Sequence, residues 1–260
     1  VWWPDGFCRQ LADRGFHVAR FDNRDTGLST HFESPRKQNP VKAFVGGTRP
    51  TYSTYDMLDD GLAVMDALDW PSAHVAGGSM GAGLAQAMAL IHPDRVRSVT
   101  SINGVPITAS KLRILGYINW STMATFLRLK PGTDRDSEIE SLTAIMRTIN
   151  GDGYPFPEEW AHEAAGMSYD RSPRDPRTSQ RQLAAGKGIR FPPLSDITVP
   201  VLVIGGGSDP LIKTRASEST AQQIPGAKLV IYPRMGHSFP AELWDDFVTE
   251  IADVARLPEP

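Results

Sequence analysis

A chain of 260 residues with 40% hydrophobic and 22% charged residues is long enough to bury one full core and has the composition of an ordinary globular protein. Its formal charge of −3 excludes the basic surface of a nucleic-acid-binding domain, and no run reaches the roughly 18 apolar residues of a membrane span. The expected partner is therefore a small molecule, and the sequence leaves the oligomeric state open. The single cysteine, Cys8, indicates a reducing compartment, the cytoplasm.

Apolar periodicity divides the first part of the chain into alternating helices and strands. The predicted elements, in chain order and alternating from helix to strand, are 2–13, 16–21, 53–69, 73–76, 79–92 and 96–102. The third of these is expected to begin at a capping box formed by Ser53 and Asp56. Such alternation predicts an α/β fold with a mostly parallel sheet flanked by helices.

Strand patterns are absent from the middle of the sequence, between Pro106 and about Pro193. The helical patterns there, separated by Pro and Gly, lie near 109–130, 134–149, 157–166 and 176–186. We expect residues 106–192 to form an inserted helical cap, or lid, and residues 1–105 and 193–260 to form the core. The alternation resumes with a strand over 199–204, a helix over 212–224, a strand over 228–232 and a last helix opened by Pro240.

The turn between the strand over 73–76 and the helix after it carries a Gly-x-Ser-x-Gly pattern, with Ser79 between Gly77 and Gly81. A serine on so sharp a turn adopts a strained backbone and presents its hydroxyl outward. Glycine is expected at 77 and at 81 because the strand and the helix approach closely there. The pattern alone is weakly specific, and its place after a strand makes Ser79 the candidate nucleophile.

Two further candidates for catalysis, Asp209 and His237, also follow predicted strands. A serine hydroxyl needs an imidazole to take its proton and a carboxylate to orient that imidazole. Taken singly, Asp209 before a proline is typical of a turn, and His237 of a surface loop. The chain order Ser, Asp, His at three strand ends favours a catalytic triad, because active sites in such sheets lie beyond the carboxyl ends of the strands.

These three motifs, in this order, resemble those of the α/β-hydrolase superfamily. The loop over 20–29 is similar to the Asp-x-Arg-Asp-x-Gly-x-Ser loop of the subgroup that includes aclacinomycin methylesterase and proline-iminopeptidase-like hydrolases. The resemblance covers essentially the whole chain and implies ester or amide hydrolysis on an α/β-hydrolase fold. Asp22, Arg24 and Asp25 in this loop are expected to brace the pocket floor rather than to act as catalytic acids.

The same resemblance implies an oxyanion hole of two backbone N–H groups, one of which belongs to Met80. The second would come from a Gly-rich loop whose place lies upstream of Val1. The strand before that loop would lie between 16–21 and 73–76, so we expect the N-terminal strands to be missing and the sequence to be a fragment of a longer gene product. The question of a signal peptide therefore stays open.

The sequence thus predicts a serine esterase that cleaves carboxylic esters of small hydrophobic molecules through an acyl-enzyme intermediate. Apolar side chains of the expected cap, among them Trp120, Met123 and Phe126, are expected to roof the substrate pocket. Neither a metal nor an organic cofactor is expected. The alternatives are a proline-iminopeptidase-like amidase, a cofactor-free haloperoxidase or perhydrolase, and a non-catalytic ligand-binding module on the same fold.

Overall fold

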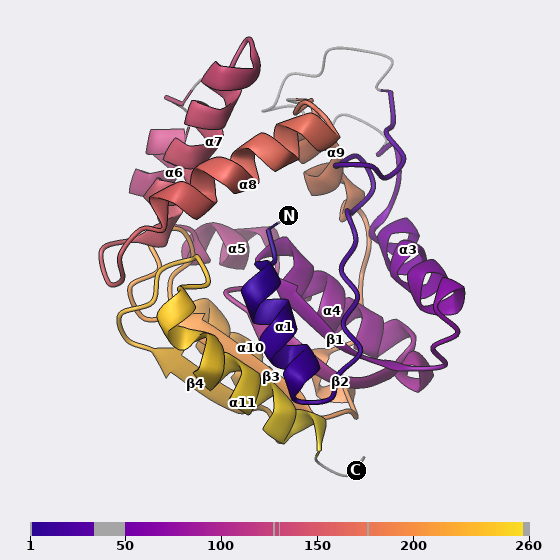
Figure 1. Cartoon of the computed structure of the whole chain (residues 1–260). Coiled ribbons are helices and arrows are strands. Elements are labelled where there is room, and N and C mark those ends of the chain that lie inside the picture. The colour runs from indigo at the N-terminus through magenta and orange to yellow at the C-terminus, as the bar shows by residue number, and fades with distance from the viewer. Residues whose placement is uncertain (1, 34–49, 127, 130, 176, 257–260) are drawn as a thin grey trace.

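The computed structural model describes residues 2–33, 50–126, 128–129, 131–175 and 177–256. In this part of the chain, four parallel strands form one sheet in the order β1-β2-β3-β4 (Figure 1). The strands are β1 (Ala73–Gly78), β2 (Val96–Ile102), β3 (Val201–Gly206) and β4 (Lys228–Tyr232). In the register of the sheet, Val99 pairs with Val75 on one side and with Val201 on the other. The predicted parallel sheet is confirmed.

Helices cover both faces of the sheet. Side chains of a strand alternate between the two faces, and every residue of β3 is buried, so both faces must be covered. The helices that pack on it or on one another are α1 (Asp5–Asp13), α3 (Thr54–Ala67), α4 (Met80–Ile91), α10 (Arg215–Gln223) and α11 (Trp244–Ala255). Val201 and Val203 pack on the face that α3 and α4 cover, whereas Leu202 and Ile204 pack on the face of α1 and α11. Figure 1 shows α1 and α11 side by side on that second face. The core therefore has two halves, one on each side of the strands.

Local sequence signals place the helix ends. The predicted capping box opens α3, because Ser53 Oγ accepts from the Asp56 N–H at 3.3 Å and Asp56 Oδ2 accepts from the Ser53 N–H at 2.7 Å. The first helix begins at Asp5 rather than at residue 2, because Pro4 has an extended backbone with ψ of 140°. The helix predicted after Pro240 is α11, which follows one 3₁₀ turn.

The strand predicted over 16–21 is wrong. The segment joins no ladder within the described ranges, and its apolar residues Val18 and Phe21 are 40% and 47% exposed. Phe16 touches β1 through an edge-on ring contact with His74, 5.8 Å between centroids. An alternating pattern tells which side chains share a face, whereas a strand also needs a hydrogen-bonding neighbour. The segment therefore runs past the sheet without becoming part of it (Figure 1).

The chain between β2 and β3 is helical, as predicted. The helices there, which we call the helical insertion, are α5 (Lys111–Tyr117), α6 (Trp120–Phe126), α7 (Arg135–Asn150), α8 (Glu158–Arg171) and α9 (Thr178–Ala185). Figure 1 shows α7, α8 and α9 in the upper part of the molecule, where α7 packs on α8. The division of the chain into a core and a cap over residues 106–192 stays a prediction. None of the helices that the structure describes is both long and apolar enough to cross a membrane.

Candidate active site

Ser79 lies in the turn that joins β1 to α4. Its φ of +54° with ψ of −115° is a backbone conformation that residues with side chains rarely adopt. The Ser79 N–H donates to the Ile102 carbonyl at the end of β2 at 2.9 Å, which ties the turn to the sheet. The residue is exposed. The turn thus has the strained geometry that the sequence predicts, and it presents a serine to solvent.

The two glycines of this turn are not equivalent. A Cβ at Gly77 would lie 2.0 Å from the Gly81 carbonyl oxygen. Real Cβ atoms essentially never come so close to another atom. A Cβ at Gly81 would meet no described atom within 4 Å apart from those of its chain neighbours and of the α4 backbone. The close approach of strand and helix therefore requires glycine at 77, and the same expectation for Gly81 is wrong.

We expect Gly77→Ala to destabilise the protein and Gly81→Ala to be tolerated. The methyl group at 77 meets backbone atoms that cannot rotate away, and overpacking of this kind costs about 1–3 kcal/mol, or more. At 81 the substitution adds a residue that favours helix by up to about 1 kcal/mol. The midpoints of urea unfolding measure both effects against the wild type. Equal midpoints for the two variants would show that the contact at 77 is relieved in another way.

His237 and Asp209 form a buried pair in the loops that follow β4 and β3. His237 Nδ1 lies 2.7 Å from Asp209 Oδ2, and the two side chains are 6% and 2% exposed. Asp209 Oδ1 accepts from the N–H groups of Leu211 at 2.7 Å and Ile212 at 2.9 Å. Because a carboxylate only accepts, Nδ1 is the donor and the neutral ring carries its free lone pair on Nε2. The pair can therefore act as an oriented general base.

The loop that carries His237 packs on the turn that carries Ser79. A Cβ at Gly78 would lie 2.7 Å from the ring of Phe239, so these two segments are in contact. Among the described residues, no hydrogen bond joins Ser79 Oγ to the His237 ring. Catalytic hydrogen bonds are often long without substrate and tighten when it binds. The structure thus brings the three predicted residues to one edge of the sheet, with the Asp–His contact formed and the Ser–His contact open.

The backbone N–H of Met80 is the first amide of α4. The first four N–H groups of a helix have no partner within it, and no backbone acceptor for Met80 is found among the described residues. The N-terminus of a helix also favours negative charge. This amide, next to Ser79, is therefore free to donate to an oxyanion formed there, and its place in an oxyanion hole stays a prediction.

The three apolar residues predicted to roof the pocket lie on α6. Trp120 is 53% exposed, while Met123 and Phe126 are partly buried. The same helix is joined to the loop after Asp209 by a hydrogen bond from Thr122 Oγ1 to a carbonyl of that loop. Within the described ranges, no hydrogen bond or ring contact joins the three residues to the candidate triad. Their role in substrate binding stays a prediction.

The loop over 20–29 is bound to helices on two sides. Arg24 donates to both carboxylate oxygens of Asp60 in α3, at 2.6 and 2.7 Å. On the other side, Arg171 at the end of α8 donates to Asp22 at 2.6 Å. Burial raises the pKa of Asp22, but hydrogen bonds from Arg171 and from a backbone N–H outweigh it, so the pKa lies below its ordinary value. These contacts fit the bracing role expected for the loop.

Asp25 in the same loop holds the helical insertion through a buried ion pair. Arg181 of α9 donates to its two carboxylate oxygens at 2.6 and 3.1 Å, and the carboxylate has no exposed area. Sequence reasoning found Asp25 and missed Arg181, since the two residues are 156 positions apart and no periodicity relates them. The pair joins the loop to the insertion.

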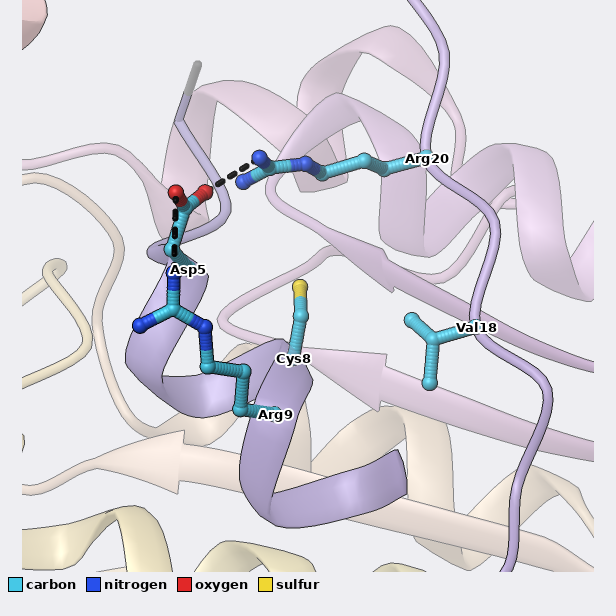
Figure 2. A pocket seen from close by; sticks show the side chains of 5 residues that line it. All are labelled: Asp5, Cys8, Arg9, Val18 and Arg20. Carbon is cyan, nitrogen blue, oxygen red and sulfur yellow. Dashed lines mark hydrogen bonds and ion pairs between the residues drawn. The ribbon is translucent and has the colours of Figure 1, made fainter. Parts of the chain in front are cut away.

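A separate cavity of about 220 Å³ lies between α1 and the extended segment after it, lined by Asp5, Cys8, Arg9, Val18 and Arg20 (Figure 2). The Asp5 carboxylate there is paired with Arg20. Burial raises the pKa of the Cys8 thiol, so the thiol stays protonated and is a poor nucleophile. None of the triad candidates lines this cavity. Among the described residues there is also no group of three or more His, Cys, Asp or Glu that could hold a metal ion.

Comparison with known proteins gives the same fold over most of the chain. A family model described as alpha/beta hydrolase fold matches residues 1–242. Rhodomycin D methylesterase DauP from Streptomyces sp. (strain C5) is 27% identical over 98% of this chain and 86% of its own length. Rhodomycin D methylesterase DnrP from Streptomyces peucetius is 26% identical with the same coverage. A solved hydrolase from Pseudomonas aeruginosa PA01 superposes with a TM-score of 0.63 at 21% identity, covering 95% of this chain and 82% of that one.

Proposed function

The chain belongs to the α/β-hydrolase family and is a carboxylic ester hydrolase, and from this premise we propose that it acts as a serine esterase with Ser79, His237 and Asp209 as its triad. The observation that carries the proposal is the buried contact of 2.7 Å between His237 Nδ1 and Asp209 Oδ2, together with the packing of the His237 loop on the Ser79 turn. This contact leaves Nε2 as the proton acceptor, which is the group that a serine nucleophile needs.

In the proposed first step, Ser79 Oγ attacks the ester carbonyl while His237 Nε2 takes the hydroxyl proton. Asp209 holds the imidazole in the required tautomer and stabilises its charged form. The Met80 N–H donates to the oxyanion of the tetrahedral intermediate, where one such donor contributes about 3–4 kcal/mol to transition-state stabilisation. The protonated His237 then gives its proton to the leaving alcohol, and the acyl group stays on Ser79.

In the second step, His237 takes a proton from water, whose oxygen attacks the acyl carbon. The tetrahedral intermediate collapses, the acid leaves, and Ser79 recovers its proton from the imidazole. The chain's own residues perform each proton transfer, and the sequence of steps needs neither a metal nor an organic cofactor.

The substrate class that we propose is a carboxylic ester of a small hydrophobic molecule. Two rhodomycin D methylesterases are similar over nearly the whole chain, which supports a methyl ester as the first to be tested. The apolar residues Trp120, Met123 and Phe126 of α6 are proposed to contact its hydrophobic part, as a section of a cap over residues 106–192. The single cysteine supports the cytoplasm as the location.

The test of this function is labelling by a fluorophosphonate, which needs no choice of substrate. An activated serine oxygen attacks the phosphorus, fluoride leaves, and the imidazole takes the proton. Peptide mass spectrometry is expected to find the label on Ser79 in the wild type and on no residue in Ser79→Ala. Labelling of both proteins to the same extent, or of neither, would contradict the proposal.

The amidase alternative requires acidic groups that are free to bind a substrate's amino group. Glu158 at the start of α8 has a carboxylate of the required kind, but this carboxylate forms an ion pair with Arg147. An exposed pair is weak and can be displaced, so turnover of an N-terminal proline amide is the direct comparison. We expect hydrolysis of a methyl ester to be faster.

A further inference from the structure

The last turn of α7 contacts the loop that carries His237. The His237 N–H donates to the Ile149 carbonyl at 2.8 Å, and the Ser238 hydroxyl donates to Asn150 Oδ1 at 2.7 Å. The helix belongs to the insertion, 88 positions away from Ser238 in the sequence. The candidate general base is therefore held by the helical insertion as well as by the sheet.

The two segments meet backbone to backbone, with no room for side chains between them. A Cβ at Gly236 would lie 1.9 Å from the Asn150 carbonyl oxygen, and one at Gly153 would lie 1.6 Å from the Arg234 carbonyl oxygen. Glycine at both positions permits this approach. A displacement of the end of α7 would therefore move the residue next to His237.

The orientation of the Asn150 amide is fixed by its surroundings. The residue is 3% exposed, and its Nδ2 donates to the carbonyls of Tyr154 at 3.0 Å and Gly151 at 3.2 Å. A flipped amide would place an oxygen against those carbonyls, so the oxygen must face Ser238. This side chain is thus a rigid acceptor for the hydroxyl that follows His237.

The sheet holds the same loop from its other side. Asn103, which follows β2 with φ of +49°, is 2% exposed. Its Nδ2 donates to the Gly236 carbonyl at 3.2 Å, and its Oδ1 accepts from the Gly206 N–H at 2.8 Å. The loop is therefore held on the sheet side by Asn103 and at Phe239 by Trp244 of α11, whose Nε1 donates to the Phe239 carbonyl at 3.0 Å, and the end of α7 holds its third side.

We propose that Asn150 is a positioning residue for catalysis, which acts through Ser238 to hold His237 in reach of Ser79. The proposal rests on the function proposed above for His237. Proton transfer requires the two heavy atoms to be about 2.6–3.2 Å apart. A shift of the base by about 1 Å costs about 100-fold in rate. The insertion then contributes to the chemical step itself, because the triad is complete only when the end of α7 is seated.

The test compares Asn150→Ala and Ser238→Ala with the wild type in two measurements. The first is the rate of fluorophosphonate labelling of Ser79 as a function of pH, and the second is kcat and KM for p-nitrophenyl acetate. We expect each variant to lower kcat and the labelling rate about 10- to 100-fold with little change in KM. The double variant is expected to have a kcat and a labelling rate no lower than those of either single variant, since both changes remove the same hydrogen bond. Ser238→Thr, which keeps the hydroxyl, is expected to retain the activity.

The matched control is Thr148→Ala, which removes a hydrogen bond within the same helix end, from Thr148 Oγ1 to the Ala144 carbonyl. It is expected to leave kcat and labelling unchanged. If Asn150→Ala does not fold, Ser238→Ala carries the test, because Ser238 is only partly buried. A folded Ser238→Ala labelled at the wild-type rate would overturn the proposal. A wild type that is not labelled at Ser79 would instead contradict the proposed function, and with it the positioning role of Asn150.

Discussion

Alanine at Ser79, at His237 or at both is expected to lower kcat for a hydrophobic methyl ester by about the same factor, on the order of 10⁶. The effects do not add, because the nucleophile and its base act as one unit and removing either one disables the proton transfer. Asp209→Asn is expected to lose less, about 10⁴-fold, since it leaves the nucleophile and the base in place and changes only the tautomer. Steady-state kinetics with release of methanol or acid measures all four variants.

Two variants serve as controls for these losses. Ser195→Ala and His162→Ala remove an exposed serine and an exposed histidine that lie outside the candidate site, and kcat is expected to stay at the wild-type value in both. A Ser79→Ala protein that retains most of the kcat would exclude Ser79 as the nucleophile. If the kcat of the double variant fell by the product of the two single-variant factors, His237 would act independently of Ser79.

Arg181→Ala is expected to lower the free energy of unfolding by about 3–5 kcal/mol, because it leaves the Asp25 charge buried without its partner. The Arg181 side chain is 5% exposed and the Asp25 side chain has no exposed area. Asp25 Oδ1 also accepts from the Phe32 N–H at 2.7 Å, which keeps the carboxylate in place when the guanidinium is gone. Equilibrium unfolding in urea measures the loss, with circular dichroism as the probe.

The control for this variant is Arg147→Ala, which removes an ion pair whose two side chains are 55% and 57% exposed. Pairs of this kind contribute about 0–1 kcal/mol, so its unfolding midpoint is expected to stay close to the wild-type one. If Arg181→Ala lowered the free energy of unfolding no more than Arg147→Ala, water or another cation would have to compensate the charge of the buried carboxylate. The contact between the loop and α9 would then not be an anchor of the helical insertion.

Apart from the strand over 16–21, the sequence by itself determined the order of strands and helices in the sheet, and it placed each candidate catalytic residue at the end of a strand. β2 (Val96–Ile102) has the predicted limits, and α3 begins at the predicted capping box. These features are local, because the period of apolar residues distinguishes a strand from a helix and a short polar motif fixes a helix start. The rule that parallel strands direct their carboxyl ends to one edge then placed Ser79, Asp209 and His237 at the same edge of the predicted sheet.

Only the tertiary structure decided which segments meet. The apolar alternation over 16–21 is as regular as that of a strand, but a strand exists only where a neighbour supplies hydrogen bonds, and the described residues supply none there. The contacts of Arg181 with Asp25 and of Asn150 with Ser238 join positions 156 and 88 residues apart. No period or motif links residues so distant, since their contact depends on how whole helices pack. Local patterns thus predicted the chemistry of the site, whereas what holds the site in place depends on the packing of the helical insertion against the loops that carry Asp25 and His237.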